Sequence, residues 1–449
     1  MGKVIDIQPL SRIEGHASIK IELDDNGNVD KAVTHFNSIR GFEKYVQGKP
    51  AEEVTRIVTR ICGICPWHHH LSSTKAVDAC FKAEVAPVGH MLRECMQNMA
   101  QINDKILHFY FLAAPDFVMG PDADYSVRNV IGIAQAAPDL AKQVIQMRQL
   151  GQMMMERFAG KVIHPIAAVP GGFAKPMSES ERKSLLEDTE TLLDFAKFTM
   201  NHAKENIFPK YLEEVTTIGT INTGFIGTVG KDGSLNFYDG DIRLMKPDGT
   251  YADFNDADYL DYIAEHVTDV SYGKYPYAKS WDEGFSMDIE NPKGIYRSNC
   301  LARINVCDGI STPLAQAELE EFRKNFGRPA QHTLLYHWAR LIELVYACEK
   351  TKELLSDTAI VGKETRFEVT PQAGRGVGHV EAPRGTLIHD YTTDENGMIV
   401  SANMIVGTTH NLAPISMSVE QAARLLISDG NIDETILNKV EMAVRAYDP

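Results

Sequence analysis

The chain has 449 residues, of which 44% are hydrophobic and 24% charged, a composition that indicates a soluble globular protein and excludes a disordered or fibrous one. No stretch reaches the roughly 20 apolar residues that a membrane-spanning helix needs, and a formal net charge of −16 argues against nucleic acid as a partner. Seven cysteines are too few for a disulfide scaffold, which favours reduced thiols that bind metal or pack as small apolar groups.

The N-terminal half combines one β region with long helices. The first residues are charged and lack a secretory signal, so we expect a cytoplasmic location. Residues 1–40 alternate as strands do, turn at Asp25-Asn26-Gly27, and predict a β hairpin. From 51 to about 215 the apolar spacing is helical, with an apolar face at 130–145. Ser178 and Glu181 predict a capping box that opens a helix through about Asn206.

The C-terminal half alternates between the two kinds of structure. Asp-Gly turns predict a small antiparallel sheet over residues 216–254, and helical spacing returns over 315–355. A β unit with a turn at Asn396-Gly397 is expected over 378–409, followed by a helical segment over 418–449 that begins at Ser418. The sequence therefore predicts one α+β domain over residues 1–449, with long central helices and small peripheral antiparallel β units.

The motif Cys62-Gly-Ile-Cys65, followed by three histidines at 68–70, carries the clearest chemistry. Two thiolates at this spacing can bind one nickel, iron, zinc or copper(I) ion. The alternatives are half of a zinc site and a redox dithiol. No second Cys-x-x-Cys is present, and spacing alone favours a metal over a disulfide only modestly.

Several stretches in a fixed order resemble those of [NiFe] hydrogenase large subunits. The resemblance begins with Arg-Ile-Cys-Gly-Ile-Cys at residues 60–65 and a histidine four residues later, His69. The other matching stretches are Arg-Ile-Glu-Gly-His at 12–16, Arg-Gly-Phe-Glu at 40–43, Asp104 to Tyr110, Pro-Gly-Gly at 170–172, Glu-Ala-Pro-Arg-Gly at 381–385 and Arg-Ala-Tyr-Asp-Pro at 445–449. The match spans almost the whole chain and implies the α+β fold of that family and turnover of dihydrogen at a nickel–iron centre.

The resemblance assigns roles to individual residues. It implies that Cys62 is a terminal thiolate on nickel and that Cys65 bridges nickel to an iron with diatomic ligands. Glu14 resembles the family's proton-relay carboxyl, against the alternative of a surface or salt-bridged glutamate. Glu43 resembles the ligand of a structural magnesium ion, which prefers carboxylate oxygen.

Arg384 is expected over the open face of the metals, oriented by Asp104 and Asp448, because a buried guanidinium needs such partners. Its alternative is an ordinary surface arginine. Pro383 is expected to shape the same wall, and His69 to support Cys65 without binding metal. Lys105 stands where many family members carry histidine, so the role of that neighbour is in doubt here.

The resemblance also implies partners. The stretches at 40–44, 108–116 and 335–343 resemble the cytoplasmic hydrogenases of methanogens that do not reduce deazaflavin and that serve heterodisulfide reductase. Because this chain has no cysteine sets for iron–sulfur clusters, electrons are expected to leave through a separate iron–sulfur small subunit, and from there through an electron-transfer subunit.

In the family, Asp-Pro at the position of Asp448-Pro449 is followed by Cys-x-x-Cys-x-x-His, which supplies two further thiolates and a magnesium ligand. We expect a separate short polypeptide to carry this motif, with cysteine or selenocysteine. A sequence that stops before the true C-terminus and a degenerate centre are the alternatives. If the motif follows Asp448-Pro449 in space, Pro449 should lie near Cys62 and Cys65.

Two rival functions are the quinone-site subunit of respiratory complex I, which lacks the cysteines, and a non-catalytic hydrogenase-like assembly subunit.

Overall fold

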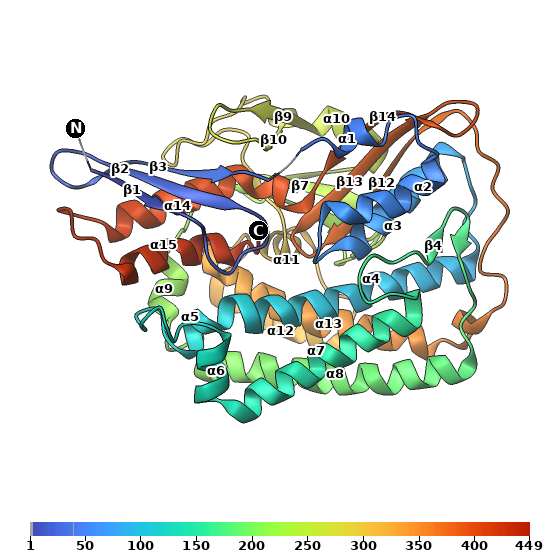
Figure 1. The fold of residues 1–449 in the computed structure, drawn as a ribbon, viewed down its shortest axis with the longest axis horizontal. Helices are drawn as coiled ribbons and strands as arrows, with labels where there is room; N and C mark the ends of the chain where they lie inside the picture. The colour runs from blue at the N-terminus through green and yellow to red at the C-terminus, as the bar shows by residue number, and fades with distance from the viewer. Residues whose placement is uncertain (1–2, 39) are drawn as a thin grey trace.

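The computed structural model describes residues 3–38 and 40–449. Met1, Gly2 and Ile39, which fall in the predicted N-terminal β region, lie outside the described residues. Long helices form one side of the molecule and small sheets the other, and the C-terminus lies near the middle, between them (Figure 1). Among the described residues, no helix is both long and apolar enough to cross a lipid bilayer.

The N-terminal sheet has three antiparallel strands in the order β1-β2-β3. They span Val4–Ile7, Ala17–Leu23 and Val29–Phe36. The predicted hairpin is therefore present as β2 and β3, and β1 adds a strand that the sequence analysis did not anticipate. The segment between β1 and β2 carries Glu14, so this sheet fixes both ends of that segment.

A short run of helices leads to the Cys-x-x-Cys motif. It consists of α1 (Phe42–Tyr45), α2 (Ala51–Ile57), the 3₁₀ helix η1 (Val58–Ile61) and α3 (Pro66–Cys80). Helix α3 is buried on nearly all sides because it lies directly on strand β12 (Gly374–Ala382). This approach needs glycine in the strand: a Cβ added at Gly376 would lie 2.2 Å from the Ala76 carbonyl oxygen. The same contact places the N-terminus of α3 near the end of β12.

The helical layer is built around α4 and α13, which pack against each other and against neighbouring helices. Its members are α4 (Pro87–Leu107), the π-helix η2 (His108–Ala113), α5 (Ala114–Val118), α6 (Val130–Ala136), α7 (Pro138–Ala159), α8 (Glu179–Asn206), α9 (Leu212–Thr217), α11 (Cys300–Val306), α12 (Pro313–Phe326) and α13 (Tyr336–Ser356). The capping box predicted at Ser178 and Glu181 is confirmed, and α8 ends at Asn206 as expected.

The remaining strands form four small sheets. A mixed sheet has the order β11-β6-β7-β8, with strands Tyr296–Arg297, Gly224–Val229, Asp241–Met245 and Tyr251–Phe254. An antiparallel sheet contains β12, β13 (Gly385–Thr393) and β14 (Ile399–Ile405). Two pairs complete the set, β4 (Ala168–Val169) with β5 (Gly172–Phe173) and β9 (Ile263–Val267) with β10 (Lys274–Ala278). Short helices lie in the connections between the longer elements: η3 (Asp256–Asp258), α10 (Tyr259–Tyr262), η4 (Lys279–Trp281), η5 (Thr333–Leu335), η6 (Thr358–Val361) and η7 (Gly407–Asn411).

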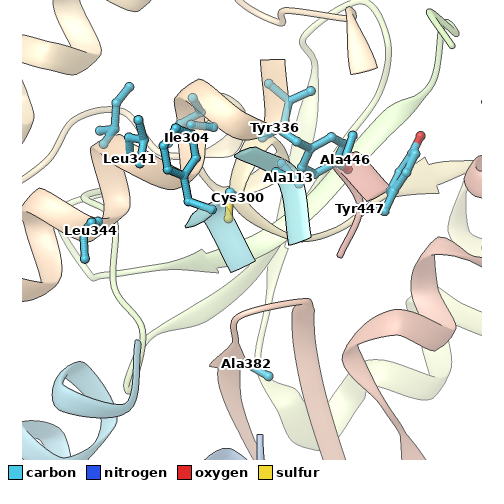
Figure 2. Close-up of a cluster of buried hydrophobic side chains, with 14 of the residues drawn as sticks. Ala113, Cys300, Ile304, Tyr336, Leu341, Leu344, Ala382, Ala446 and Tyr447 are labelled. Carbon is cyan, nitrogen blue, oxygen red and sulfur yellow. The ribbon is translucent and has the colours of Figure 1, made fainter. Parts of the chain in front are cut away.

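Two helices, α14 (Leu412–Leu426) and α15 (Glu434–Ala446), close the chain. The main hydrophobic core reaches the end of α15, where Ala446 and Tyr447 lie near Tyr336 of α13 (Figure 2). The rings of Tyr336 and Tyr447 are 4.7 Å apart between centroids. This packing sets the position of the residues that follow α15.

Three predictions need correction. The single closing helix from Ser418 is two helices, because Asp429 and Gly430 adopt positive φ angles between them. The helical stretch 315–355 is also divided, at Gly327, which has a φ of 75°. The strands within 216–254 pair antiparallel as predicted, and β11, from outside that range, adds a strand parallel to β6. The apolar face at 130–145 is partly exposed: Ile131 and Ile145 are 66% and 57% accessible.

Candidate functional site

The two cysteines of the Cys-x-x-Cys motif lie at the start of α3. Cys62 follows η1 and is half-buried, whereas Cys65 is the N-cap residue of α3 and is 5% exposed. The backbone N–H of Cys65 donates to Cys62 Sγ at 3.1 Å. The hydrogen bond with Cys62 and burial both raise the pKa of the Cys65 thiol well above its usual value. Without a metal, Cys65 therefore stays protonated, and a bound metal is needed to make it a thiolate.

Glu14 reaches the motif from the loop between β1 and β2. Its Oε2 accepts a hydrogen bond from the Cys62 thiol at 3.3 Å, and its Oε1 accepts one from the Gly63 backbone N–H at 3.1 Å. The Glu14 backbone N–H donates to the carbonyl oxygen of Pro449 at 3.0 Å. A half-buried carboxylate is thus fixed beside one thiol and beside the last described residue.

Arg384 lies in the two-residue turn between β12 and β13, where Ala382 pairs with Gly385. Gly385 has a φ of 142°, and a Cβ there would lie 2.5 Å from Ser298 Oγ, so glycine is required. The Arg384 guanidinium donates to Asp104 Oδ2 at 3.1 Å and to Asp448 Oδ1 at 2.9 Å. All three side chains are at least 95% buried.

The charges of this triad determine its protonation. Burial lowers the pKa of Arg384, but Asp104 and Asp448 outweigh burial, so its pKa lies well above the usual value and the guanidinium stays charged. Burial raises the pKa of Asp448 to about 7, against the opposing effect of Arg384. Asp448 adopts a left-handed backbone conformation with a φ of 56° at the end of α15. The triad is therefore one fixed positive charge held between two buried carboxyl groups.

These residues surround a cavity of about 340 Å³. Its lining includes Glu14, Glu43, Cys62, Cys65, His69, Arg384 and Pro449. Glu43 of α1 is half-buried, and its Oε1 accepts a hydrogen bond from the Met404 backbone N–H at 3.3 Å. Pro383 is buried in the same turn as Arg384, but Ala382 and Arg384 line the cavity in its place.

The three histidines of the motif are buried and neutral. Burial lowers the pKa of His69 to about 3 and those of His68 and His70 to about 4. His68 pairs with Gln97 at 2.8 Å, and His70 with the Thr55 carbonyl oxygen at 2.9 Å. Both pack in the protein interior and do not face solvent.

The residues fit a metal centre that brings ligands of its own. Within residues 3–38 and 40–449, no three His, Cys, Asp or Glu side chains come together as a metal site. Among the described residues, four buried polar atoms near the cavity lack a hydrogen-bond partner: His69 Nε2, Asp104 Oδ1, Arg384 Nε and Asp448 Oδ2. Two thiols beside unpaired buried polar atoms suit a group that carries further polar ligands.

The sequence analysis singled out Lys105 but missed the buried network to which it belongs. Lys105 does not line the cavity but forms a fully buried ion pair with Glu343 at 2.8 Å. Glu343 also binds Arg303, which donates to the carbonyl oxygens of Ala382 and Pro383 at 2.9 and 3.1 Å. This network holds the Arg384 turn. Its members are far apart in sequence, so no local pattern could have revealed it.

Comparison with known proteins identifies the family. A model of the nickel-dependent hydrogenase family matches residues 40–143, and a HoxL-like model matches residues 4–39. A subunit of the vhu-type F420-non-reducing hydrogenase of Methanococcus voltae is 48% identical over 430 residues, which cover 96% of this chain and 100% of that protein. A subunit of the F420-non-reducing hydrogenase of Methanothermobacter thermautotrophicus is 43% identical, over 99% of this chain and 93% of that protein.

Solved structures of hydrogenases resemble this chain over its whole length. An NAD⁺-reducing [NiFe]-hydrogenase in the H₂-reduced state is 38% identical with a TM-score of 0.93, over 100% of this chain and 98% of that chain. The Ni-Fe-Se hydrogenase of Desulfovibrio vulgaris Hildenborough has a TM-score of 0.80 over the same shares and, at 21% identity, shows a common α+β fold. The expected fold class is confirmed. The chain belongs to the large subunits of [NiFe] hydrogenases, nickel-dependent oxidoreductases that act on dihydrogen, and is similar to those of the F420-non-reducing type found in methanogens.

Proposed function

We propose that Cys62 and Cys65 hold the nickel–iron centre of this hydrogenase, in one domain formed by residues 1–449. The observation that carries the proposal is the contact of Cys62 with Glu14 in a cavity that Cys65 and Arg384 also line. When bound, the centre supplies heterolytic cleavage of dihydrogen to a proton and a hydride. By resemblance, Cys62 and Cys65 would hold this centre as thiolate ligands.

Cys62 and Glu14 then form the first step of proton transfer. Cys62 Sγ accepts the proton, and Glu14 Oε2 lies 3.3 Å away, within reach for a direct transfer. The hydrogen bond from the Gly63 backbone N–H to Oε1 keeps the carboxylate oriented while its other oxygen changes protonation. This half-buried group can pass the proton outward.

Arg384 supplies a fixed positive charge at the cavity wall. Two carboxylates hold its planar fork, and its Nε is buried without a partner among the described residues. Such a preorganised charge acts on groups in the cavity without reorganising during the reaction. His69, one helical turn after Cys65, supports the bridging thiolate, and the buried Pro383 gives the turn its shape.

Two further features complete the proposed centre. Glu43 is proposed to bind magnesium, since it presents a carboxylate at the edge of the cavity and accepts one long hydrogen bond there, at 3.3 Å. The remaining two thiolates would come from a Cys-x-x-Cys segment that enters beside Pro449, a cavity-lining residue.

The chain is a subunit of a hydrogenase complex, as the names of its relatives also state for those proteins. We propose that its direct electron acceptor is an iron–sulfur small subunit, followed by an electron-transfer subunit, with heterodisulfide reductase beyond it. Support comes from the likeness to F420-non-reducing hydrogenases. The expected cytoplasmic location stays a prediction.

Metal analysis of the complex, purified without oxygen, tests the proposal. We expect nickel and iron in the unmodified complex and loss of both metals in the Cys62→Ser variant. Cys348→Ala is the matched control, because Cys348 is fully buried in α13 and does not line the cavity. Absence of both metals from the unmodified complex would favour the non-catalytic assembly subunit. Mass spectrometry of the same sample identifies the iron–sulfur subunit and shows which polypeptide carries the further Cys-x-x-Cys segment.

A further inference from the structure

Two segments that carry site residues meet at one buried carboxylate, that of Asp116 in α5. Its side chain is 3% exposed and accepts a hydrogen bond from the Arg12 guanidinium, which belongs to the loop between β1 and β2. Arg445 of α15 donates from Nη1 to both carboxylate oxygens of Asp116, at 3.2 and 3.1 Å. Arg12 lies two residues before Glu14, and Arg445 lies three residues before Asp448. Asp116 therefore connects the segment that carries Glu14 to the helix end that carries Asp448.

The loop between β1 and β2 depends on other elements for its conformation. Residues 8–16 contain no helix or strand, and Arg12 within them has a φ of 56°. A non-glycine residue in this left-handed region costs on the order of 1–3 kcal/mol and persists only where its surroundings hold it. The Arg12 guanidinium also donates to the Leu112 carbonyl oxygen at 2.8 Å. Arg445 donates to the carbonyl oxygen and the hydroxyl of Ser11, at 3.2 and 3.0 Å. The loop is thus held from η2, α5 and α15.

Asp116 is charged and balances the positive groups around it. Burial raises its pKa, but Arg445 and Arg12 outweigh burial, so the pKa lies below its usual value. Arg128 Nε lies 4.0 Å from Asp116 Oδ1, so a third guanidinium is near the same carboxylate. Removing one partner of a buried ion pair leaves the other charge uncompensated. Without the charge on Asp116, Arg12 and Arg445 would repel each other, and the loop would move away from α15.

We propose that Asp116 is a positioning residue of this hydrogenase: by holding two guanidiniums on one carboxylate, it sets the distance between Glu14 and the Cys62 thiol. The inference rests on the proposed function, in which Cys62 passes a proton to Glu14. These two groups are 3.3 Å apart. A displacement of about 1 Å between reacting groups can lower a rate by on the order of a hundredfold. Asp116 does not line the cavity, so it acts only through the segments that it holds.

The Asp116→Asn variant of the intact complex tests this inference. Asparagine keeps the size of the side chain and one acceptor oxygen but removes the charge. We expect turnover of dihydrogen to fall by about tenfold, as a displacement of less than about 1 Å implies. The ratio of the rates in H₂O and in D₂O should rise, because proton transfer then limits the reaction more strongly. Nickel and iron content should stay unchanged, because Cys62 and Cys65 belong to other elements.

Asp390→Asn is the matched control. Asp390 of β13 also accepts two hydrogen bonds from one arginine, Arg375 of β12, at 3.1 and 2.9 Å, and its side chain is 11% exposed. Neither residue lines the cavity. Turnover and the rate ratio of this variant should stay near those of the unmodified complex. Lower turnover in Asp116→Asn with an unchanged rate ratio would overturn the inference, because it would indicate a general loss of structure.

A second pair of variants decides the question if Asp116→Asn does not assemble. The Arg12 side chain is 14% exposed, so Arg12→Gln disturbs less of the core and leaves the ion pair of Asp116 with Arg445 in place. It should raise the same rate ratio and speed amide hydrogen exchange over residues 10–16. Arg12→Lys, which keeps a charge beside Asp116, should restore part of the turnover. An unchanged rate ratio in Arg12→Gln would contradict the inference, whereas full turnover in Glu14→Gln would instead count against the proposed proton transfer.

Discussion

At the scale of single residues, the proposed role of Arg384 depends on the shape of its side chain. Its guanidinium donates to Asp104 and Asp448 with different nitrogens. Lysine would keep the charge but cannot hold both carboxylates in one plane. We expect Arg384→Lys to lower dihydrogen turnover by about tenfold or more, as loss of one buried charge-assisted hydrogen bond implies, while nickel and iron stay bound.

Hydrogen-uptake assays and metal analysis of the same sample measure the two effects separately. Arg375→Lys is the matched control, because Arg375 also pairs with one aspartate, Asp390, but is 44% exposed. Its turnover should remain near that of the unmodified enzyme. Equal turnover in Arg384→Lys and the unmodified enzyme would remove Arg384 from the mechanism.

The sequence predicted which residues matter here better than it predicted how they are held. The motifs identified Glu14, Cys62 and Arg384 through the resemblance, but no periodicity in the chain predicts that residues 14, 62 and 384 share a cavity. One neighbouring pair did leave a signal: His389, whose Nε2 lies 3.2 Å from His69 Nδ1, and Tyr391 are two apart in a strand and therefore point to the same face. Such spacing is too common to identify a site without the fold.

At the scale of elements, the end of α15 is a built platform for Asp448. A helix end leaves its last carbonyl oxygens without helical partners. Here His108 donates to the Arg445 carbonyl oxygen at 2.9 Å, Arg340 to that of Ala446 at 3.0 Å, and Asn299 to that of Tyr447 at 2.7 Å. Three buried donors from η2, α13 and the start of α11 thus fix the turn that leads into Asp448.

We therefore expect Arg340→Gln to loosen this platform. The substitution leaves the buried Ala446 carbonyl oxygen unpaired, which should cost about 1–3 kcal/mol. Hydrogen exchange of the amides at 444–448 should become faster, and turnover should fall with it. Arg424→Gln is the control, because Arg424 is 44% exposed on α14 and pairs with Glu420. Unchanged exchange at 444–448 in Arg340→Gln would show that the other two donors suffice.

Local signals predicted some elements and missed others for identifiable reasons. The capping box at Ser178 located α8 because a cap is chemistry within four residues. The break between α14 and α15 was missed because their apolar spacing continues on both sides of it. The Gly430 turn that divides them also contacts Gly27 of the N-terminal hairpin, through a backbone hydrogen bond of 2.9 Å. That contact is tertiary and leaves no trace in local periodicity.

At the scale of the whole molecule, buried neutral histidines couple stability to pH. Burial lowers the pKa of seven fully buried histidines to about 4, to about 3 or well below the usual value: His68, His69, His70, His108, His337, His389 and His410. In the unfolded chain each would have a pKa near 6.5. Unfolding below that pH therefore takes up protons.

This proton uptake makes the free energy of unfolding depend on pH. Because the unfolded state binds more protons, the free energy of unfolding falls as the pH drops from about 6.5 towards 4, by up to about 1.4 kcal/mol per pH unit for each histidine. Asp448, with its pKa raised to about 7 by burial, and Glu94, whose pKa burial also raises, act in the opposite direction, but they are two groups against seven. We expect the urea midpoint of the purified protein to fall steeply between about pH 6.5 and about pH 5.

Calorimetry in buffers of different ionisation enthalpy should detect uptake of several protons on unfolding at about pH 5. His337→Gln should make the dependence on pH shallower, since burial lowers the pKa of His337 to about 3, whereas His266→Gln should not, since His266 is exposed. A midpoint that stays level or rises on acidification would mean that the buried histidines are charged in the folded protein.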